Sequence, residues 1–328
     1  MHRITRFAAR LLLSGAVTVT VAGPASRTIA QDAFPKQVRI VVPFSAGASN
    51  DAIARTIAGP LGKRLETTII VENRPGAAGT IGADAVARSA RDGSVLLLTS
   101  STFLTAAATQ ARLPYDPITA FAPVATVGQN PSILAVPASS AFRSPAELFA
   151  AARAKPGDLT YGSAGVGSIG HLLTELISAG AGIQMRHVPY KGAANAAIDL
   201  GGGQIQVMIS SYSTLSPYLK ADKVRILAVT SRQPHPAFPD IPPLNATLAG
   251  FASETWAGVF APAGTASRVL DRLNREINEV AALPETRAIL EPDGMLPHAM
   301  TPASFAARMK QELAQWKQIA TERRITAE

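Results

Sequence analysis

Apolar residues spaced two and four positions apart divide the chain into strands and helices from residue 38 onwards. Every second residue in 38–42 is apolar, which predicts a strand that ends before Pro43. Apolar residues then recur every four positions and predict a helix: Ile53, Ile57, Leu61 and Leu65. Ser49 or Asp51 is the candidate N-cap of this helix, and Gly59-Pro60 is expected to kink or interrupt it.

The alternation of strands and helices continues to residue 100 and then begins again. In the first unit, strands over 68–72 and 94–100 enclose a helix over 83–89, an order that predicts a parallel sheet. After the proline-punctuated segment 113–117, further strands are expected over 133–136, 159–163, 185–188, 205–209 and 224–229. Helices are expected near 144, where Ser144-Pro145-Ala146-Glu147 has the form of a capping box, and over 172–178 and 193–200. A strand over 256–261 and amphipathic helices over 268–282 and 302–323 complete a protein of two α/β units.

The first thirty residues do not belong to this globular pattern. Three arginines precede an uncharged, mostly apolar stretch that runs from Leu11 to about Gly23, which predicts a signal peptide. The stretch is short for a membrane span, and no stop-transfer pattern follows it. Cleavage is expected after Ala30, with Ala25 as a competing site. We therefore expect a periplasmic mature protein.

Composition narrows the classes of function. The 328 residues are 47% hydrophobic, which is enough material for two domains. The absence of cysteine excludes disulfides, thiolate metal sites, a cysteine nucleophile and a lipid-anchored N-terminal cysteine. The predicted signal peptide holds four of the 31 basic residues and none of the 23 acidic ones, so its removal lowers the formal charge from +8 to +4. The remaining basic residues are scattered, which argues against nucleic-acid binding.

Two loops built from small residues are the candidate binding elements. Each follows a strand and precedes a helix, at residues 44–51 and 163–171, and ligands of open parallel sheets collect at such strand ends. Accessible backbone N–H groups and the partial positive charge of a helix N-terminus suit a carboxylate without requiring an arginine. Each loop taken alone is equally well explained as a tight turn in which glycine serves the backbone geometry. One such loop on each unit favours a shared ligand.

The candidate ligand-binding residues lie in these two loops and at three other strand ends. In the loops they are Phe44, Ala46, Gly47, Ala48, Ser49, Asp51, Ser163, Ala164, Gly165, Gly167, Ser168 and His171. At the other strand ends they are Ser100, Tyr190, Lys191, Ser210, Ser211 and Tyr212. Two of them have a common structural alternative, because an aspartate such as Asp51 often caps a helix and a lysine such as Lys191 usually stays solvated.

Enzymatic alternatives find little support in the sequence. The glycines of 165–170 nominally match the dinucleotide-binding pattern, but the next strand ends at 188–191 without the acidic residue that holds a ribose. Neither Ser163 nor Ser168 has the glycine that a nucleophile elbow requires two positions before the serine, because Tyr161 and Val166 stand there. A secreted hydrolase that used Ser168 and His171 would lack an acidic third member. The other histidines are isolated, so we expect no catalysis, no cofactor and no metal site.

Ordered motifs along the whole mature chain resemble one family. They are Val38–Phe44 with Gly47 and Asp51, Val71–Gly79 with Ile81-Gly82-Ala83, Leu113–Pro117, Tyr161–Gly165 with Gly167-Ser168 and His171, Val188–Gly192, and Phe260–Thr265. This series resembles the substrate-binding proteins of tripartite tricarboxylate transporters, also called Bug receptors. Their ligands include di- and tricarboxylates, acidic amino acids and aromatic acids.

The resemblance implies a type II periplasmic-binding-protein fold. Two lobes, each with a mainly parallel sheet flanked by helices, would be joined by crossing strands near 121–136 and 250–261. Lobe 1 would comprise 31–130 and 250–328, and lobe 2 would comprise 131–249. The lobes of a monomer would close by hinge motion on a carboxylate held by the two loops. A two-subunit membrane permease is the implied partner, and a signalling system served by a ligand sensor is the alternative.

Two departures from the family pattern bear on the ligand. Gly47-Ala48 stands where a glycine pair is expected, which slightly narrows one backbone approach. Ser210-Ser211-Tyr212 stands where the family often carries an acidic residue. An uncharged site there disfavours amino acids, whose ammonium group requires a carboxylate. It also leaves Tyr212 to stack on a ring or to donate a hydrogen bond to it, so a di- or tricarboxylate or an aromatic acid is expected.

Overall fold

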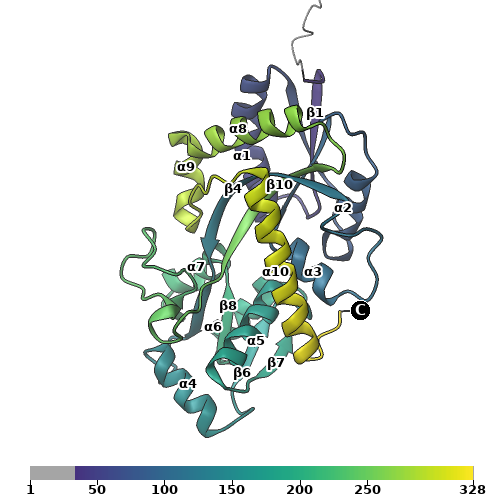
Figure 1. Cartoon of the computed structure of the whole chain (residues 1–328). Coiled ribbons are helices and arrows are strands. Elements are labelled where there is room, and N and C mark those ends of the chain that lie inside the picture. The colour runs from purple at the N-terminus through teal and green to yellow at the C-terminus, as the bar shows by residue number, and fades with distance from the viewer. Residues whose placement is uncertain (1–33, 328) are drawn as a thin grey trace, which may run out of the picture. The chain divides into compact units, whose positions relative to one another are not determined.

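The computed structural model describes residues 34–327, and the predicted signal peptide lies outside them. These residues form two five-stranded sheets (Figure 1). The first sheet has the strand order β2-β1-β3-β10-β4 and consists of β1 (Gln37–Val42), β2 (Thr68–Asn73), β3 (Val95–Ser100), β4 (Phe121–Pro131) and β10 (Glu254–Pro262). The second has the order β7-β6-β8-β5-β9 and consists of β5 (Ile133–Pro137), β6 (Thr160–Ser163), β7 (Arg186–Pro189), β8 (Val207–Ser210) and β9 (Val224–Val229).

In each sheet four strands share one direction and one strand is reversed. In the first sheet β1 is parallel to β2 and β3, whereas β10 is antiparallel to both β3 and β4. In the second sheet β6 is parallel to β7 and β8, whereas β5 is antiparallel to both β8 and β9. The predicted pair of mainly parallel sheets is therefore confirmed. Both reversed strands, β10 and β5, adjoin the segments where the chain passes between the sheets.

Helices flank both sheets. Those that follow strands of the first sheet are α1 (Ser49–Leu65), α2 (Thr80–Ala87) and α3 (Thr102–Thr109), with the short turn η1 (Ala77–Gly79) before α2. Those of the second sheet are α4 (Pro145–Ala154), α5 (Ile169–Ala181), α6 (Ala193–Gly201) and α7 (Tyr212–Lys220), and η2 (Leu244–Ala246) follows β9. The C-terminal region adds α8 (Ser267–Ala282), α9 (Pro284–Leu290), η3 (Glu291–Asp293) and α10 (Pro302–Glu322).

Two local predictions about helices have different outcomes. The expected interruption of α1 is wrong, because the helix continues through Pro60. Its apolar stripe is buried on both sides of the proline, at Ile57 and Leu61, and this packing maintains the helix there. The capping box of α4 is confirmed, since Ser144 accepts a hydrogen bond from the Glu147 N–H group at its N-terminus.

The chain crosses between the sheets at two adjacent segments. β4 ends at Pro131 and β5 begins at Ile133, so Ser132 alone separates them. Thr230, directly after β9, is fully buried and bonds twice to Ser132. Its N–H group donates to the Ser132 carbonyl (3.0 Å), and its Oγ1 accepts from the Ser132 N–H group (2.8 Å). The Thr230 carbonyl in turn accepts from the N–H group of Ser253, just before β10. The lobe boundaries expected at 130 and 249 stay a prediction.

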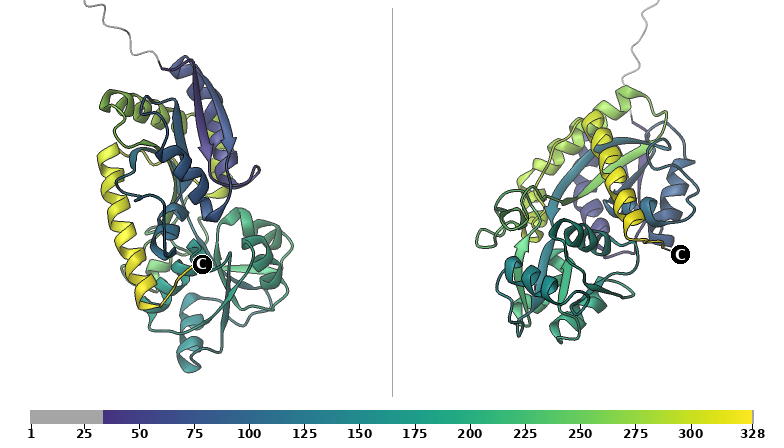
Figure 2. Two further views of the ribbon diagram at one scale, coloured as in Figure 1. Left: turned by 90° about the vertical axis from the view of Figure 1, so that its right-hand side faces the viewer. Right: turned by 60° about the horizontal axis from the view of Figure 1, so that its bottom comes forward.

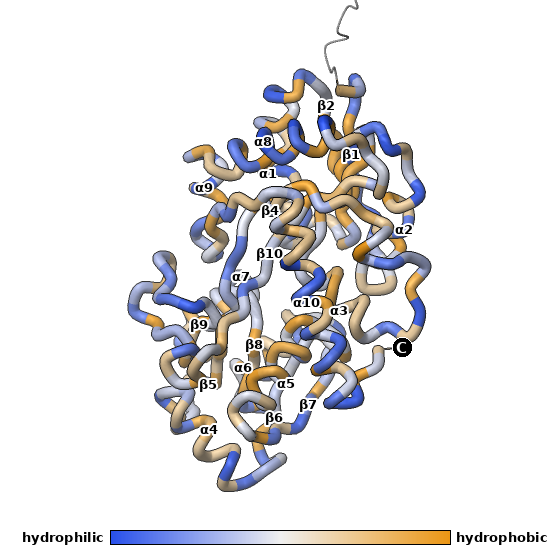
Figure 3. The backbone as a smooth tube through the Cα atoms, in the orientation of Figure 1, coloured by the Kyte–Doolittle hydropathy of each residue, from blue (hydrophilic) through white to orange (hydrophobic). Residues whose placement is uncertain are grey.

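The C-terminal helix α10 contacts elements of both sheets. It packs on α3 and β4 and also touches α5, where Arg323 lies 3.4 Å from Glu175 (Figure 2). The backbone of β10 approaches α10 so closely that a Cβ atom at Gly258 would lie 2.6 Å from the Phe305 ring. A single hydrophobic cluster joins α10 to residues of both sheets, among them Leu134. Figure 3 shows mainly orange, hydrophobic backbone along α5 and near β1, and blue, hydrophilic backbone at many of the outer turns. Within residues 34–327, no helix is long and apolar enough to cross a membrane.

Candidate functional site

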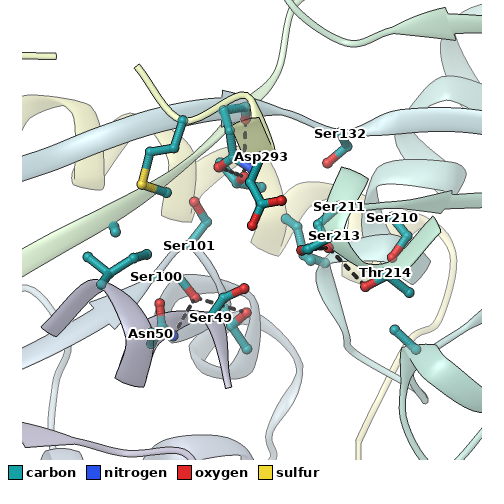
Figure 4. A pocket seen from close by; sticks show the side chains of 18 of the residues that line it. Ser49, Asn50, Ser100, Ser101, Ser132, Ser210, Ser211, Ser213, Thr214 and Asp293 are labelled. Atoms are coloured by element: carbon teal, nitrogen blue, oxygen red, sulfur yellow. Dashed lines mark hydrogen bonds between the residues drawn. The ribbon is translucent and has the colours of Figure 1, made fainter. Parts of the chain in front are cut away.

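A cleft of about 460 Å³ is lined by residues of both sheets and of the crossing segments. Its polar lining is dominated by hydroxyl and amide side chains, which face one another across the cleft in Figure 4. The residues labelled there are Ser49, Asn50, Ser100, Ser101, Ser132, Ser210, Ser211, Ser213, Thr214 and Asp293. Its apolar lining includes Ile289, Leu290 and Met295. A cleft of this size and mixed character suits a small organic molecule.

Five helix N-termini contribute to this cleft. The lining includes residues of the first turn, or the N-cap, of each: Ser49 of α1, Ser101 of α3, Ser168 of α5, Ala193 of α6 and Ser211 of α7. None of these five helices has a side-chain capping hydrogen bond. The first N–H groups of each helix are consequently available as donors, and each terminus adds a partial positive charge of roughly half a unit. The cleft is therefore suited to an anion.

Two helices away from the cleft begin differently. The N-termini of α4 and α10 are capped by the side chains of Ser144 and Thr301, and both helices have proline at N1 or N2. Proline removes an N–H donor that such a terminus leaves unpaired. None of the five helices at the cleft has proline in this position. Because α2 and α8 also begin without a cap or a proline, the distinguishing feature of the cleft is that five such N-termini meet there.

The first predicted loop is held in place by the Asp51 side chain. Asp51 is 3% exposed and accepts hydrogen bonds from Gly47 N (2.8 Å), Asn73 Nδ2 (2.9 Å) and Arg55 Nε (3.0 Å). The bonds from Arg55 and Gly47 lower the pKa of the Asp51 carboxyl group to about 2. The carboxylate is thus fully engaged within the loop. It shapes the turn at Gly47, whose φ of +82° favours glycine, and it does not line the cleft.

The second predicted loop rests on two stacked histidines. The rings of His171 and His187 are 3.7 Å apart, and the Nδ1 atom of His171 accepts a hydrogen bond from the Gly167 N–H group (3.2 Å). The Nε2 atom of His187 lies 2.7 Å from Ser163 Oγ. The pKa of each histidine is lowered to about 4. Burial is the main cause for both rings, and the neighbouring His187 contributes to the shift of His171. Both rings are neutral at pH 7, so they act as hydrogen-bonding supports of the loop.

This support explains two results that the sequence did not predict. His187 is not isolated, because β6 and β7 pair in register with Tyr161 opposite His187. Ser168 does not bond to His171 and instead donates to the Gly165 carbonyl oxygen (2.7 Å). The Ser168–His171 pair required for acyl transfer is therefore not formed.

The structure brings seven of the predicted residues to the cleft. They are Gly47, Ser49, Ser100, Ala164, Ser168, Ser210 and Ser211. The other predicted residues do not line it: Phe44, Ala46, Ala48, Asp51, Ser163, Gly165, Gly167, His171, Tyr190, Lys191 and Tyr212. The tyrosines are engaged elsewhere, since the Tyr190 hydroxyl donates to Asp199 (2.7 Å) and the Tyr212 ring packs on Phe238. The stacking of Tyr212 on a ligand stays a prediction.

Several lining residues were missed by sequence reasoning. Asn50, Ser101, Ser213 and Thr214 directly adjoin predicted residues, so a wider window around each strand end would have included them. Asn130, Ser132 and Thr255 belong to the crossing segments. Asp293 is the only charged residue of the lining, and it lies in η3, far along the chain from every predicted loop. The sequence analysis considered charge only at residues 210–212 and did not predict this acidic residue.

Two mixed sheets joined by crossing segments, with a ligand-sized cleft between their helix N-termini, define a solute-binding protein of the periplasmic type. Residues 53–325 match the family described as "Tripartite tricarboxylate transporter family receptor" (TctC). The chain belongs to this family, and the resemblance to the Bug receptors is confirmed. Members of this family are receptors for transport, and it is not a family of enzymes.

Relatives and solved structures agree with this assignment over nearly the full chain. Protein BugT of Bordetella pertussis is 32% identical over 320 residues, which cover 95% of this chain and 97% of BugT. Rpa4515 of R. palustris, solved with adipate, is 32% identical with a TM-score of 0.76. The match covers 88% of this chain and 98% of the Rpa4515 chain. MatC of Rhodopseudomonas palustris, solved with bound malate, is 28% identical with a TM-score of 0.73 and covers 86% and 98%.

Proposed function

We propose that this protein is a periplasmic receptor that captures a small carboxylate between its two lobes and delivers it to a two-subunit membrane permease. The observation that carries the proposal is the meeting of five uncapped helix N-termini at one cleft whose lining contains no lysine, arginine or histidine. The donors for an anion must then come from the backbone and from hydroxyl and amide side chains. The malate of MatC and the adipate of Rpa4515 support a carboxylate as the ligand class.

The free N–H groups at the cleft come from helices that follow strands of both sheets. In α1 the N–H groups of Ser49 and Asn50 have no hydrogen-bond acceptor within residues 34–327. In α5 the same holds for Ile169 and Gly170, which also line the cleft. A carboxylate has two oxygen atoms and room for about four hydrogen bonds, so it can accept from both helices at once. Contacts to both sheets would stabilise the closed arrangement of the lobes.

Thermal denaturation of the mature protein with a panel of acids tests the proposal. A ligand at 100 times its dissociation constant adds about 2.7 kcal/mol to the free energy of unfolding, so a true ligand raises the melting temperature clearly. The panel contains di- and tricarboxylic, aromatic, hydroxy and amino acids, with neutral sugars and polyamines as controls. We expect at least one acid to raise the melting temperature while the sugars and polyamines do not. A shift produced only by a sugar or a polyamine would contradict the proposal.

A further inference from the structure

The acidic side chain in the cleft has a distinctive position. Asp293 ends the turn η3, which follows α9, and it is the only charged residue of the lining. Figure 4 shows its carboxylate directed into the cavity, between Ser100 and Ser101 on one side and Ser211 and Ser213 on the other. It faces the cleft from the C-terminal region of the chain, whereas the helix N-termini are contributed by the strand ends. The cleft thus combines the five helix N-termini, which together form an anion-binding wall, with one anionic side chain, that of Asp293.

Within residues 34–327 the Asp293 carboxylate has no hydrogen-bond or ion-pair partner. Its neighbour Glu291, in the same turn, is paired with Arg287, and Asp51 in the first loop is paired with Arg55. Apolar residues of its own segment, Leu290 and Met295, line the cleft beside it. Asp293 is exposed to solvent, and partial burial of its carboxyl group raises the pKa of that group. Because no side chain of residues 34–327 occupies its oxygen atoms, they can accept a hydrogen bond from a donor that arrives with the ligand.

We infer that Asp293 determines ligand specificity by accepting a hydrogen bond from an ammonium or hydroxyl group at the end of the ligand remote from its carboxylate. The inference rests on the proposed function, because the ligand carboxylate must first be held at the helix N-termini. A donor at the remote end then completes a pair with Asp293. A second carboxylate at that end meets a like charge and is repelled.

The inference narrows the substrate class to amino- or hydroxy-substituted carboxylates. It also reverses the expectation drawn from Ser210-Ser211-Tyr212, because the carboxylate that an ammonium group needs is supplied by another segment of the chain. The solved structures with malate and adipate both hold dicarboxylates, which differ in length and in the hydroxyl group of malate. A residue at the position of Asp293 is a means by which one member of the family selects among acids with different end groups.

Binding measurements with acids that differ only in their end group test this inference. The probes are straight-chain carboxylates of four to six backbone carbons that end in an ammonium, hydroxyl, methyl or carboxylate group, titrated by calorimetry at pH 7.5. In the wild-type protein we expect the ammonium and hydroxyl series to bind about tenfold or more tightly than the methyl series, the gain of a charge-assisted hydrogen bond. The dicarboxylates should bind most weakly. In Asp293→Asn the preference for ammonium should disappear, and the dicarboxylates should gain affinity.

A matched variant distinguishes a direct contact between Asp293 and the ligand from a general effect of removing one negative charge. Glu291→Gln removes one negative charge two residues away, from a side chain that does not line the cleft and is paired with Arg287. It should leave the ranking of end groups unchanged. The inference about Asp293 would be overturned if both variants changed the ranking equally. It would also be overturned if Asp293→Asn kept the wild-type ranking and the wild-type melting temperature. In either case the proposed function would stand. If no acid of any kind bound the wild-type protein, the proposed function itself would fail.

Discussion

Replacing Ser49, the first residue of α1, by proline is the most specific way to remove one donor from the anion-binding wall. Ser49 is the N1 residue of this helix, it is exposed, and its N–H group has no acceptor within residues 34–327. Proline is well tolerated at N1, because its fixed φ fits the helix and its missing N–H group would be unpaired in any case. The preceding Ala48 already has the extended conformation, φ −71° and ψ 160°, that a residue before proline prefers. Ser49→Pro should therefore fold normally.

The expected loss of affinity follows from one hydrogen bond to a charged acceptor. Such a bond contributes about 1.5–3 kcal/mol, which corresponds to a roughly 10- to 150-fold rise in the dissociation constant. Ser49→Pro also removes the hydroxyl group, so Ser49→Ala is the proper reference. We expect the dissociation constant of Ser49→Pro, measured by calorimetry with the best acid, to exceed that of Ser49→Ala by about tenfold or more.

The chain offers a matched control at the start of α8. Ser267 is also an exposed N1 residue that follows an alanine N-cap, and Ala266 has a similar conformation, φ −59° and ψ 138°. It does not line the cleft. Ser267→Pro should leave both the dissociation constant and the melting temperature close to wild type. If Ser49→Pro and Ser49→Ala bound the acid equally well, the backbone of α1 would have no role in holding the carboxylate.

Three further predictions concern the supports of the site. Between pH 6.5 and 4 His171 and His187 bind protons in the unfolded chain but not in the folded protein, where both pKa values are near 4. The free energy of unfolding should therefore decrease by about 1.4 kcal/mol for each histidine per unit by which the pH is lowered. Urea denaturation should show this slope and a shallower one in His187→Gln, and equal slopes would contradict the prediction. Thr230→Val leaves the buried Ser132 N–H group without its 2.8 Å acceptor and should cost about 1–3 kcal/mol in urea denaturation, whereas Thr230→Ser should recover most of the loss; similar losses in both would contradict the assignment. Gly167→Ala brings a Cβ atom 2.4 Å from Thr109 Oγ1 at a φ of +77° and should lower the melting temperature more than Gly157→Ala, which has a φ of +79° and no atom within 4 Å; equal effects would leave only backbone strain.

Local periodicity carried most of the fold prediction. The apolar alternation of β1 and the four-residue spacing of α1 are properties of adjacent residues, and both elements form close to where they are expected. In contrast, α3 was not predicted. It has no charged residue, and its consecutive residues Phe103, Leu104, Thr105 and Ala106 are all buried, so its sequence shows no polar face.

The site was predicted as far as it depends on strand ends. Ser49, Ser168 and Ser211 follow strands, and the rule that ligands collect at such ends placed them together. The role of Asp51 was only partly predictable, because Arg55 lies one helical turn away whereas Asn73 is brought close by packing. The role of His171 was not predictable, because its partner His187 is also brought close by packing. Asp293 had no local signal at all. Its position depends on how α9 and η3 are carried to the cleft by the return of the chain through β10 and α8.

The proposed binding mode requires the ligand carboxylate to lie at helix N-termini. A crystal structure of the mature protein with its best acid tests this requirement. We expect carboxylate oxygens about 3 Å from the N–H groups at the starts of α1 and α5, with no lysine or arginine in contact. A bound acid whose carboxylate is held by a basic side chain, or lies away from both helix N-termini, would contradict it.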